Sequence, residues 1–193
     1  IGETQGILAG PAYSKSVGKT WYPANTSNAA IGQSDNMFSP IQLAAYAMTI
    51  ANDGVRYKTH LVKSVRSYDG TETVVKPQVA ATVKFSKEAI DAVREGMIKA
   101  TKYPSGTARV AFSDAPYQAA AKTGTAQTGN SKRSEHGVFI AYAPANDPEV
   151  AIAVVLENGT SRPSALLARK VLDAYFNSKS DGSAPAPQGE LLP

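Results

Sequence analysis

Apolar residues recur along the chain with two different periods. In residues 138–143 and 150–156 they follow one another almost without a break, which is typical of strands covered on both faces. A third strand is expected where the apolar residues 117–121 lead into the polar stretch 122–127. After Pro163, apolar side chains return about once per helical turn, which predicts a final helix.

Two earlier segments predict helices, and each begins after a serine that can cap it. Ser39 precedes a proline and stands three residues before Gln42, which completes a capping box. Residues 41–51 then repeat apolar side chains at helical spacing. Ser86 precedes a second helix, whose apolar face runs over residues 90–98.

The segments between these elements are rich in turn residues. Asp69-Gly70 separates two strand-like runs, residues 60–68 and 71–76, and predicts a hairpin at the periphery of the fold. Residues 107–112 predict a short helix. Residues 1–32 are rich in glycine, proline, serine and asparagine, so a loop with a short strand or helical turn is expected there.

Taken in order, these elements predict an α+β protein, an antiparallel sheet with helices packed on it. The length of 193 residues is within the range of one domain, and 42% apolar with 19% charged residues suits a globular fold; we assign residues 1–177 to the C-terminal part of a single domain. Residues 178–193 combine serine, lysine, glycine and proline, and this composition predicts a flexible tail.

Composition and charge exclude several classes of function. The net charge of +4 is small and scattered, which argues against a nucleic-acid partner. The absence of cysteine excludes disulfides and thiolate metal sites. The two histidines, His60 and His136, lie far apart without a carboxylate pattern, so we expect no metal and no cofactor. No apolar run approaches the roughly 20 residues that a membrane-spanning helix needs.

The stretch from Lys122 to Gln127 holds the candidate chemistry. Its first three residues form Lys-Thr-Gly, one of three motifs of serine β-lactamases and penicillin-binding proteins. Gly124 would let a ligand approach the strand closely, and the hydroxyls of Thr123 and Thr125 can donate to a substrate carboxylate. The Lys122 ammonium can hold a proton network near a nucleophile. The tripeptide alone occurs by chance in many proteins, so only its sequence context can show whether it is a functional motif.

That context is a series of short segments that resembles the transpeptidase domain of class B, high-molecular-weight penicillin-binding proteins. The resemblance covers residues 4–177, and its specificity lies in the order of the segments rather than in any single one. The segments are Ala30–Gln33, Ser39–Ala44, Asn52–Gly54, His60–Val62, Gly106–Ala108, Lys122–Gln127 and His136–Pro144.

The resemblance implies a bacterial serine D,D-transpeptidase that cross-links peptidoglycan stem peptides through an acyl-enzyme. β-Lactam antibiotics would acylate the same serine. Lys122 would act in the proton network, and Thr123, Gly124 and Thr125 would bind substrate. The protein would work on the extracytoplasmic side of the bacterial cytoplasmic membrane, with its anchor outside this chain. The family's site also needs a nucleophile motif, S-x-x-K, and an S-x-N motif.

Literal matches to both motifs exist, from Ser16 to Lys19 and from Ser34 to Asn36. A nucleophilic serine should open a helix so that the lysine one turn later faces it, whereas Ser16 lies among glycines and prolines. The spacing between the two matches also leaves little room for the family's helical subdomain. We therefore expect both true motifs, and the nucleophile, upstream of Ile1, and we expect the chain alone to be inactive.

Two alternatives remain open at this stage. The chain could belong to a non-catalytic binding or scaffold module of the same fold, or to a β-lactamase or D,D-carboxypeptidase. The upstream sequence discriminates between an enzyme and a scaffold, because only the enzyme needs both missing motifs. A chain without the preceding part of its own domain is further expected to form homo-oligomers that cover exposed apolar surface.

Overall fold

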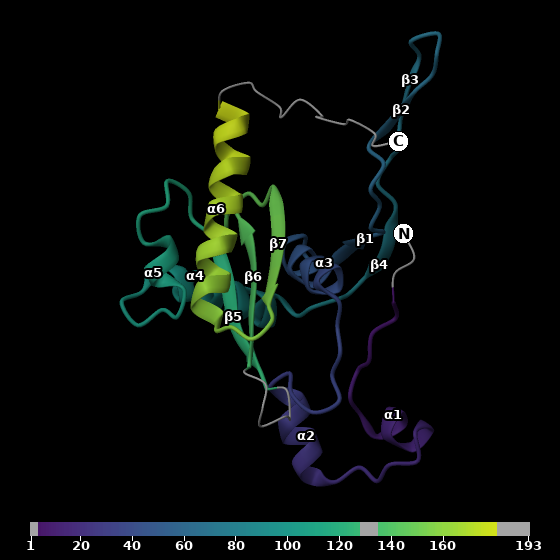
Figure 1. The fold of residues 1–193 in the computed structure, drawn as a ribbon, viewed down its shortest axis with the longest axis vertical. Helices are drawn as coiled ribbons and strands as arrows, with labels where there is room; N and C mark the ends of the chain where they lie inside the picture. The colour runs from purple at the N-terminus through teal and green to yellow at the C-terminus, as the bar shows by residue number, and fades with distance from the viewer. Residues whose placement is uncertain (1–3, 128–134, 181–193) are drawn as a thin grey trace.

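A three-stranded antiparallel sheet lies at the centre of the computed structural model, which describes residues 4–127 and 135–180. The strand order is β5-β6-β7, so that β6 is paired on both sides (Figure 1). The strands are β5 (Ala120–Ala126), β6 (His136–Ala143) and β7 (Val150–Leu156). In this register Lys122 lies opposite Ile140, and Val138 lies opposite Val155. The three predicted strands are therefore confirmed.

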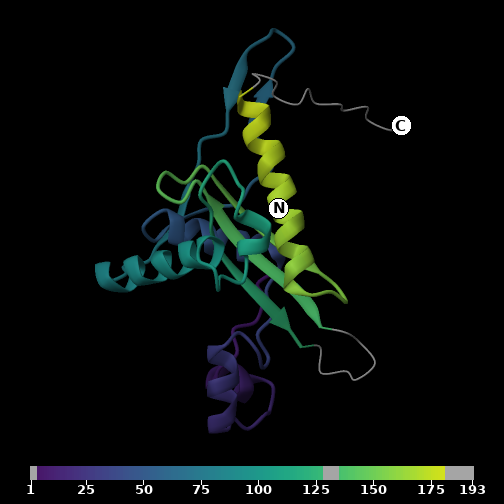
Figure 2. The ribbon, with the colours of Figure 1, turned by 90° about the vertical axis from the view of Figure 1, so that its left-hand side faces the viewer.

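Helices cover both faces of the sheet, which explains why β6 is apolar on both sides. On one face lie α5 (Arg109–Phe112) and α6 (Ser161–Ser180), and the rings of Phe112 and Phe139 stack there at 5.7 Å. On the other face lie α3 (Pro40–Ala51) and α4 (Lys87–Lys102), packed around the buried ring of Tyr142 (Figure 2). The predicted α+β class, an antiparallel sheet packed by helices, is confirmed.

Helix α3 begins at the predicted capping box. The Ser39 hydroxyl accepts a hydrogen bond from the backbone N–H of Gln42, and the Gln42 side chain accepts one from the backbone N–H of Ser39. At the other end of α3, Arg94 donates to the carbonyl oxygens of Ile50 and Ala51. Donors from a neighbouring helix therefore satisfy carbonyls that the helix end leaves unpaired.

Two small strand pairs flank this body. β2 (Ser64–Arg66) and β3 (Glu72–Val74) form the hairpin predicted around Asp69-Gly70. β1 (Val55–Tyr57) pairs with β4 (Val79–Thr82), which the local pattern did not predict because each strand is very short and the pairing is non-local. Gly54 is required next to this pair, since its φ is +90° and a Cβ would lie 2.0 Å from the Val83 carbonyl oxygen.

The expectation of a loop with a short strand or helical turn over residues 1–32 underestimates the helix content, because the segment contains two short helices. These are α1 (Pro11–Ser16) and α2 (Pro23–Ala30), and each has proline in its first turn. Prolines that read as loop residues in the sequence are helix starts here. We call residues 10–35 the N-terminal lobe. It lies beyond the end of β5, away from the body of the sheet (Figures 1 and 2).

The last helix continues beyond the predicted boundary at residue 177. Helix α6 ends at Ser180, so its final turn includes the first residues of the predicted tail. The rest of that tail, residues 181–193, lies outside the described residues. Within the described ranges, no helix has both the length and the apolarity needed to cross a lipid bilayer.

Candidate functional site

The unpaired edge of β5 is where the predicted site residues lie. β5 pairs with β6 on one side only. Two of its backbone carbonyls, and one just before the strand, point to the unpaired side. The Thr123 oxygen accepts a hydrogen bond from Lys122 Nζ at 2.6 Å, and the Thr125 oxygen accepts one from Gln33 Nε2 at 2.9 Å. The Ala119 oxygen accepts from Thr101 Oγ1 at 2.7 Å. Alternate backbone groups thus line an edge to which an extended chain could pair.

The Lys122 side chain is exposed on the face of the sheet that α3 and α4 cover further along. Its neighbour on that face, Ala120, is fully buried, so β5 emerges from the core at Lys122. Within the described residues Lys122 has no carboxylate partner, and its ammonium rests on the Thr123 carbonyl. An ammonium without a counter-ion at a strand edge is available to stabilise negative charge on a ligand.

The two threonines of the stretch lie in different surroundings. Thr123 is only 8% exposed, and its Oγ1 lies 2.9 Å from Thr107 Oγ1. Gly106 allows the preceding turn to lie close to the end of α4, because a Cβ there would lie 2.5 Å from the Ala100 carbonyl oxygen. Thr125 is exposed. The segment Gly106–Ala108 therefore supports the motif strand from behind, and only Thr125 presents a freely exposed hydroxyl.

Gly124 lies between them on an open part of the strand. A Cβ built there would meet only Val138, at 3.4 Å, which is an ordinary contact. Packing within the described residues therefore does not require glycine at this position. The absence of a side chain does leave the surface of the strand open to a ligand.

A network around Arg169 joins α6 to the segment that leads into β5. Arg169, from α6, donates to the carboxylates of Asp173 and Asp114 and to the carbonyl oxygen of Ala111. Tyr117 donates to Asp173 at 2.8 Å, and burial together with this bond raises the pKa of its phenol. The hydrogen bond from Arg169 lowers the pKa of the Asp114 carboxyl. Sequence reasoning missed this network because, apart from the Arg169–Asp173 pair, its bonds join residues that are more than fifty positions apart.

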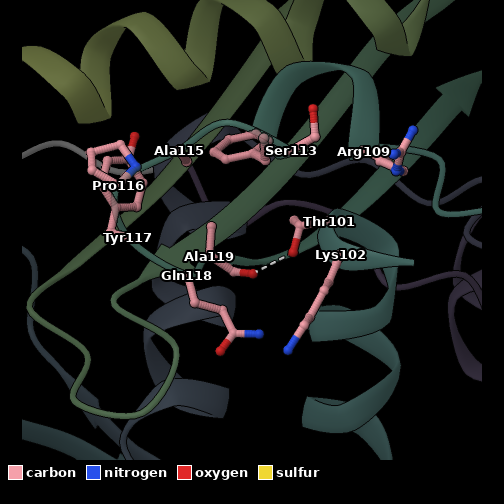
Figure 3. A pocket seen from close by; sticks show the side chains of 10 residues that line it. Thr101, Lys102, Arg109, Ser113, Ala115, Pro116, Tyr117, Gln118 and Ala119 are labelled. Atoms are coloured by element: carbon pink, nitrogen blue, oxygen red, sulfur yellow. Dashed lines mark hydrogen bonds between the residues drawn. The ribbon is translucent and has the colours of Figure 1, made fainter. Parts of the chain in front are cut away.

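A cavity of about 380 Å³ lies beside the same lead-in segment. Its lining includes Lys102 from the end of α4, Arg109 from α5, and Gln118 just before β5 (Figure 3). Lys102 and Gln118 extend toward the same side in this view, below the hydrogen bond between Thr101 and Ala119. None of the predicted site residues lines the cavity, but Ala119, whose carbonyl oxygen belongs to the same edge of β5, does.

The structure places the literal S-x-x-K match in a geometry unsuited to nucleophilic catalysis. Ser16 is the last residue of α1 rather than the first, and its hydroxyl donates to the Tyr13 carbonyl oxygen at 2.7 Å. The chain then turns at Gly18, whose φ is +70°. Lys19 follows this turn and pairs with Asp35, so it does not face Ser16 from one helical turn away.

The literal S-x-N match forms a structural turn. Ser34 has a φ of +68°, an uncommon conformation for a residue with a side chain. The Asn36 amide donates to the carbonyl oxygens of Ala29 and Gln33 and accepts from the backbone N–H of Ala9. Its hydrogen-bonding groups are therefore used inside the turn.

Gln33 is a site residue that chemical reasoning from the sequence missed. Its amide reaches the Thr125 carbonyl although 92 positions separate the two residues. The only signal was that Gln33 ends the segment Ala30–Gln33, which is part of the family resemblance. Nothing in its local sequence marked it as a contact of the motif strand.

Comparison with known proteins identifies the family of this arrangement. Residues 3–175 match the family model of the penicillin binding protein transpeptidase domain. The peptidoglycan D,D-transpeptidase MrdA of Escherichia coli K12 is 33% identical over 183 residues, which cover 87% of this chain and 29% of the relative. Penicillin-binding protein 2A of Bacillus subtilis is 38% identical over 172 residues, covering 78% of this chain and 24% of the relative.

Solved structures of penicillin-binding proteins have the same fold as this chain. The imipenem acyl-enzyme complex of penicillin-binding protein A from M. tuberculosis has a TM-score of 0.73 at 27% identity, over 90% of this chain and 37% of that one. Pseudomonas aeruginosa PBP2 in complex with WCK 5153 has a TM-score of 0.71 at 31% identity, over 100% of this chain and 41% of that one. The chain therefore spans well under half the length of the proteins it matches.

Proposed function

This chain belongs to the penicillin-binding protein transpeptidase family, and from that premise we propose that it forms one wall of the active site of a peptidoglycan D,D-transpeptidase. One observation carries the proposal. The unpaired edge of β5 presents the ammonium of Lys122, without a carboxylate partner among the described residues, beside the outward backbone groups of Thr123 and Thr125. This combination suits a site that binds an extended peptide and stabilises negative charge.

The proposed reaction is an acyl transfer between stem peptides. A serine oxygen bonds to a peptide carbonyl carbon, the C–N bond breaks, and the serine proton ends on the released amine. A second stem-peptide amine then attacks the acyl-enzyme, and the serine regains a proton from that amine. β-Lactams would acylate the same serine and remain attached.

Residues of β5 would stabilise the charge that develops during both steps. The backbone N–H of Thr125 faces the unpaired edge and would donate to the oxyanion, an effect worth about 3 kcal/mol in such sites. Lys122 would hold the proton network next to the serine. The exposed hydroxyl of Thr125 is well placed for a substrate carboxylate, whereas Thr123 is nearly buried against Thr107 and would contact substrate only after a local shift.

The nucleophilic serine would come from the part of the domain that precedes Ile1. The positions of Ser16 at the end of α1 and Ser34 in a strained turn support this assignment. The chain alone would then be inactive, and its essential partner would be the remainder of its own domain. A reaction on stem peptides would take place on the extracytoplasmic side of the bacterial cytoplasmic membrane, so we propose that the protein acts there, with its anchor outside these residues.

Replacing Lys122 tests the assignment in the full-length protein that carries this segment. We expect Lys122→Ala to slow acylation by a fluorescent penicillin by at least about 100-fold, because a preorganised charge next to the reacting atoms is lost. Lys170→Ala is the matched control, since Lys170 is an exposed lysine on α6, which covers the other face of the sheet from Lys122. An unchanged acylation rate in Lys122→Ala would refute the proposed role.

The source of the nucleophile can be tested separately on the 193-residue chain. We expect no covalent adduct after incubation with penicillin, as judged by intact mass. An adduct mapped to Ser16 or Ser34 would overturn the assignment. In the full-length protein, a long-lived acyl-enzyme supports a transpeptidase, and rapid hydrolysis of the adduct would indicate a β-lactamase or carboxypeptidase instead.

A further inference from the structure

The amide of Gln33 occupies the strand edge that the proposed reaction would use. Its Nε2 donates to the Thr125 carbonyl oxygen at 2.9 Å. Among the described residues, this is the one hydrogen bond between the N-terminal lobe and the central sheet. The lobe contributes little else to the packing, because α2 has no buried residue and α1 has only Ser14.

This contact closes the edge against other extended chains. The carbonyl oxygens of Thr123 and Thr125 both point to the unpaired side of β5. Each already accepts a hydrogen bond from a side chain: Lys122 donates to Thr123, and Gln33 donates to Thr125. A peptide that adds to this edge as a new strand places its own N–H groups on the outward carbonyls of β5. It therefore needs the position at the Thr125 carbonyl where the Gln33 carboxamide now lies.

We propose that Gln33 is a specificity-determining tether that an extended ligand displaces. The inference rests on the proposed function, since it concerns the ligand of the same site. Gln33 holds the lobe against β5 in the free protein, and the backbone N–H of the bound ligand replaces it on the Thr125 carbonyl. A ligand without an N–H in that register breaks the Gln33 bond and leaves the carbonyl without a replacement, so it binds less well.

The size of the effect follows from exchanging one hydrogen bond for another. A side-chain amide bond at an exposed site contributes little net stability, so its removal changes apparent affinity by about two- to tenfold. We expect Gln33→Ala to raise the second-order rate of acylation by a fluorescent penicillin by that factor in the full-length protein. Asn28→Ala is the matched control, because Asn28 is an exposed amide on the same lobe. Its rate should stay within about twofold of wild type, the scatter expected of a surface substitution.

A second measurement follows the tether directly. Amide hydrogen exchange over residues 23–33 should be faster in Gln33→Ala than in wild type, and bound penicillin should raise the wild-type exchange toward the mutant level. An unchanged or reduced acylation rate in Gln33→Ala would overturn the inference, because Gln33 would then support the working strand rather than compete with ligand.

Failure of the proposed function would look different. If the wild-type protein is not acylated at all, the transpeptidase assignment fails, whatever Gln33 does. In that case, hydrogen exchange measured without ligand still tests whether Gln33 holds the lobe against β5. Equal exchange over residues 23–33 in wild type and Gln33→Ala would overturn it independently.

Discussion

The body of the protein and its N-terminal lobe are stabilised in different ways. In the body, helices on both faces bury side chains such as Phe139 and Leu172 completely against the sheet. In the lobe, short helices are held by proline starts, turn hydrogen bonds and one ion pair between Lys19 and Asp35. The body owes its structure to packing, whereas the lobe depends on local hydrogen bonds.

The candidate site lies at the border between these two regions. The body fixes the backbone of β5 through its pairing with β6, and the Arg169 network holds the segment that leads into the strand. The lobe reaches the opposite, unpaired edge through Gln33. This arrangement suits the binding of an extended ligand. The strand is held in place by the body, and only one hydrogen bond from the lobe has to break before a ligand can pair with the edge.

The largest predicted effect contrasts core residues of the two regions. Phe139→Ala should lower the free energy of unfolding by about 3–5 kcal/mol, because it removes a fully buried ring and leaves a cavity. Trp21→Ala in the lobe should lower it by less than about 1 kcal/mol, since Trp21 is half-buried and its main polar contact is an exposed bond to Thr26. Urea denaturation measures both changes. Equal losses would show that lobe and body form one cooperative core.

A smaller effect is expected at the capping box that opens α3, on the border between the two regions. Ser39→Ala removes one half of a reciprocal pair of hydrogen bonds and should destabilise the protein by about 1 kcal/mol. Ser86→Ala, at the start of α4, removes a single cap bond to Ala89 and is the natural comparison. Thermal unfolding should rank Ser39→Ala as at least equally harmful; a clearly milder effect would contradict a structural role for the box.

The parts of the fold that could be predicted are those that local rules determine. Ser39 and Ser86 marked helix starts because capping depends on neighbouring residues alone. The strands β6 and β7 were evident because burial on both faces requires unbroken apolar runs. The lobe was misread because Pro11 and Pro23 are equally common in loops and at helix starts, and no apolar period followed them.

The candidate site also contains residues that the local sequence could reveal and residues that it could not. Lys122 to Thr125 form a contiguous motif, so the sequence was enough to single them out. Gln33 reaches β5, and Arg169 reaches the segment before it, from distant positions in the sequence, and only the folded structure brings them there. The prediction that Thr123 and Thr125 act alike depended on residue type, and burial of Thr123 against Thr107 distinguishes them.

The smallest predicted effect concerns a buried hydroxyl in the body and tests whether that hydroxyl has a hydrogen-bond partner. Tyr142 is fully buried, and its hydroxyl has no hydrogen-bond partner among the described residues. Burying an unpaired hydroxyl is unfavourable, so Tyr142→Phe should leave the free energy of unfolding unchanged or raise it by up to about 1 kcal/mol.

Tyr117→Phe makes the same chemical change where the hydroxyl does have a partner. It removes the bond to Asp173, so it should destabilise the protein by about 1–2 kcal/mol. Urea denaturation of the two variants side by side gives the comparison. A loss of stability in Tyr142→Phe as large as that in Tyr117→Phe would mean that the Tyr142 hydroxyl is paired after all, and that the body holds a polar contact at its centre rather than a purely apolar core.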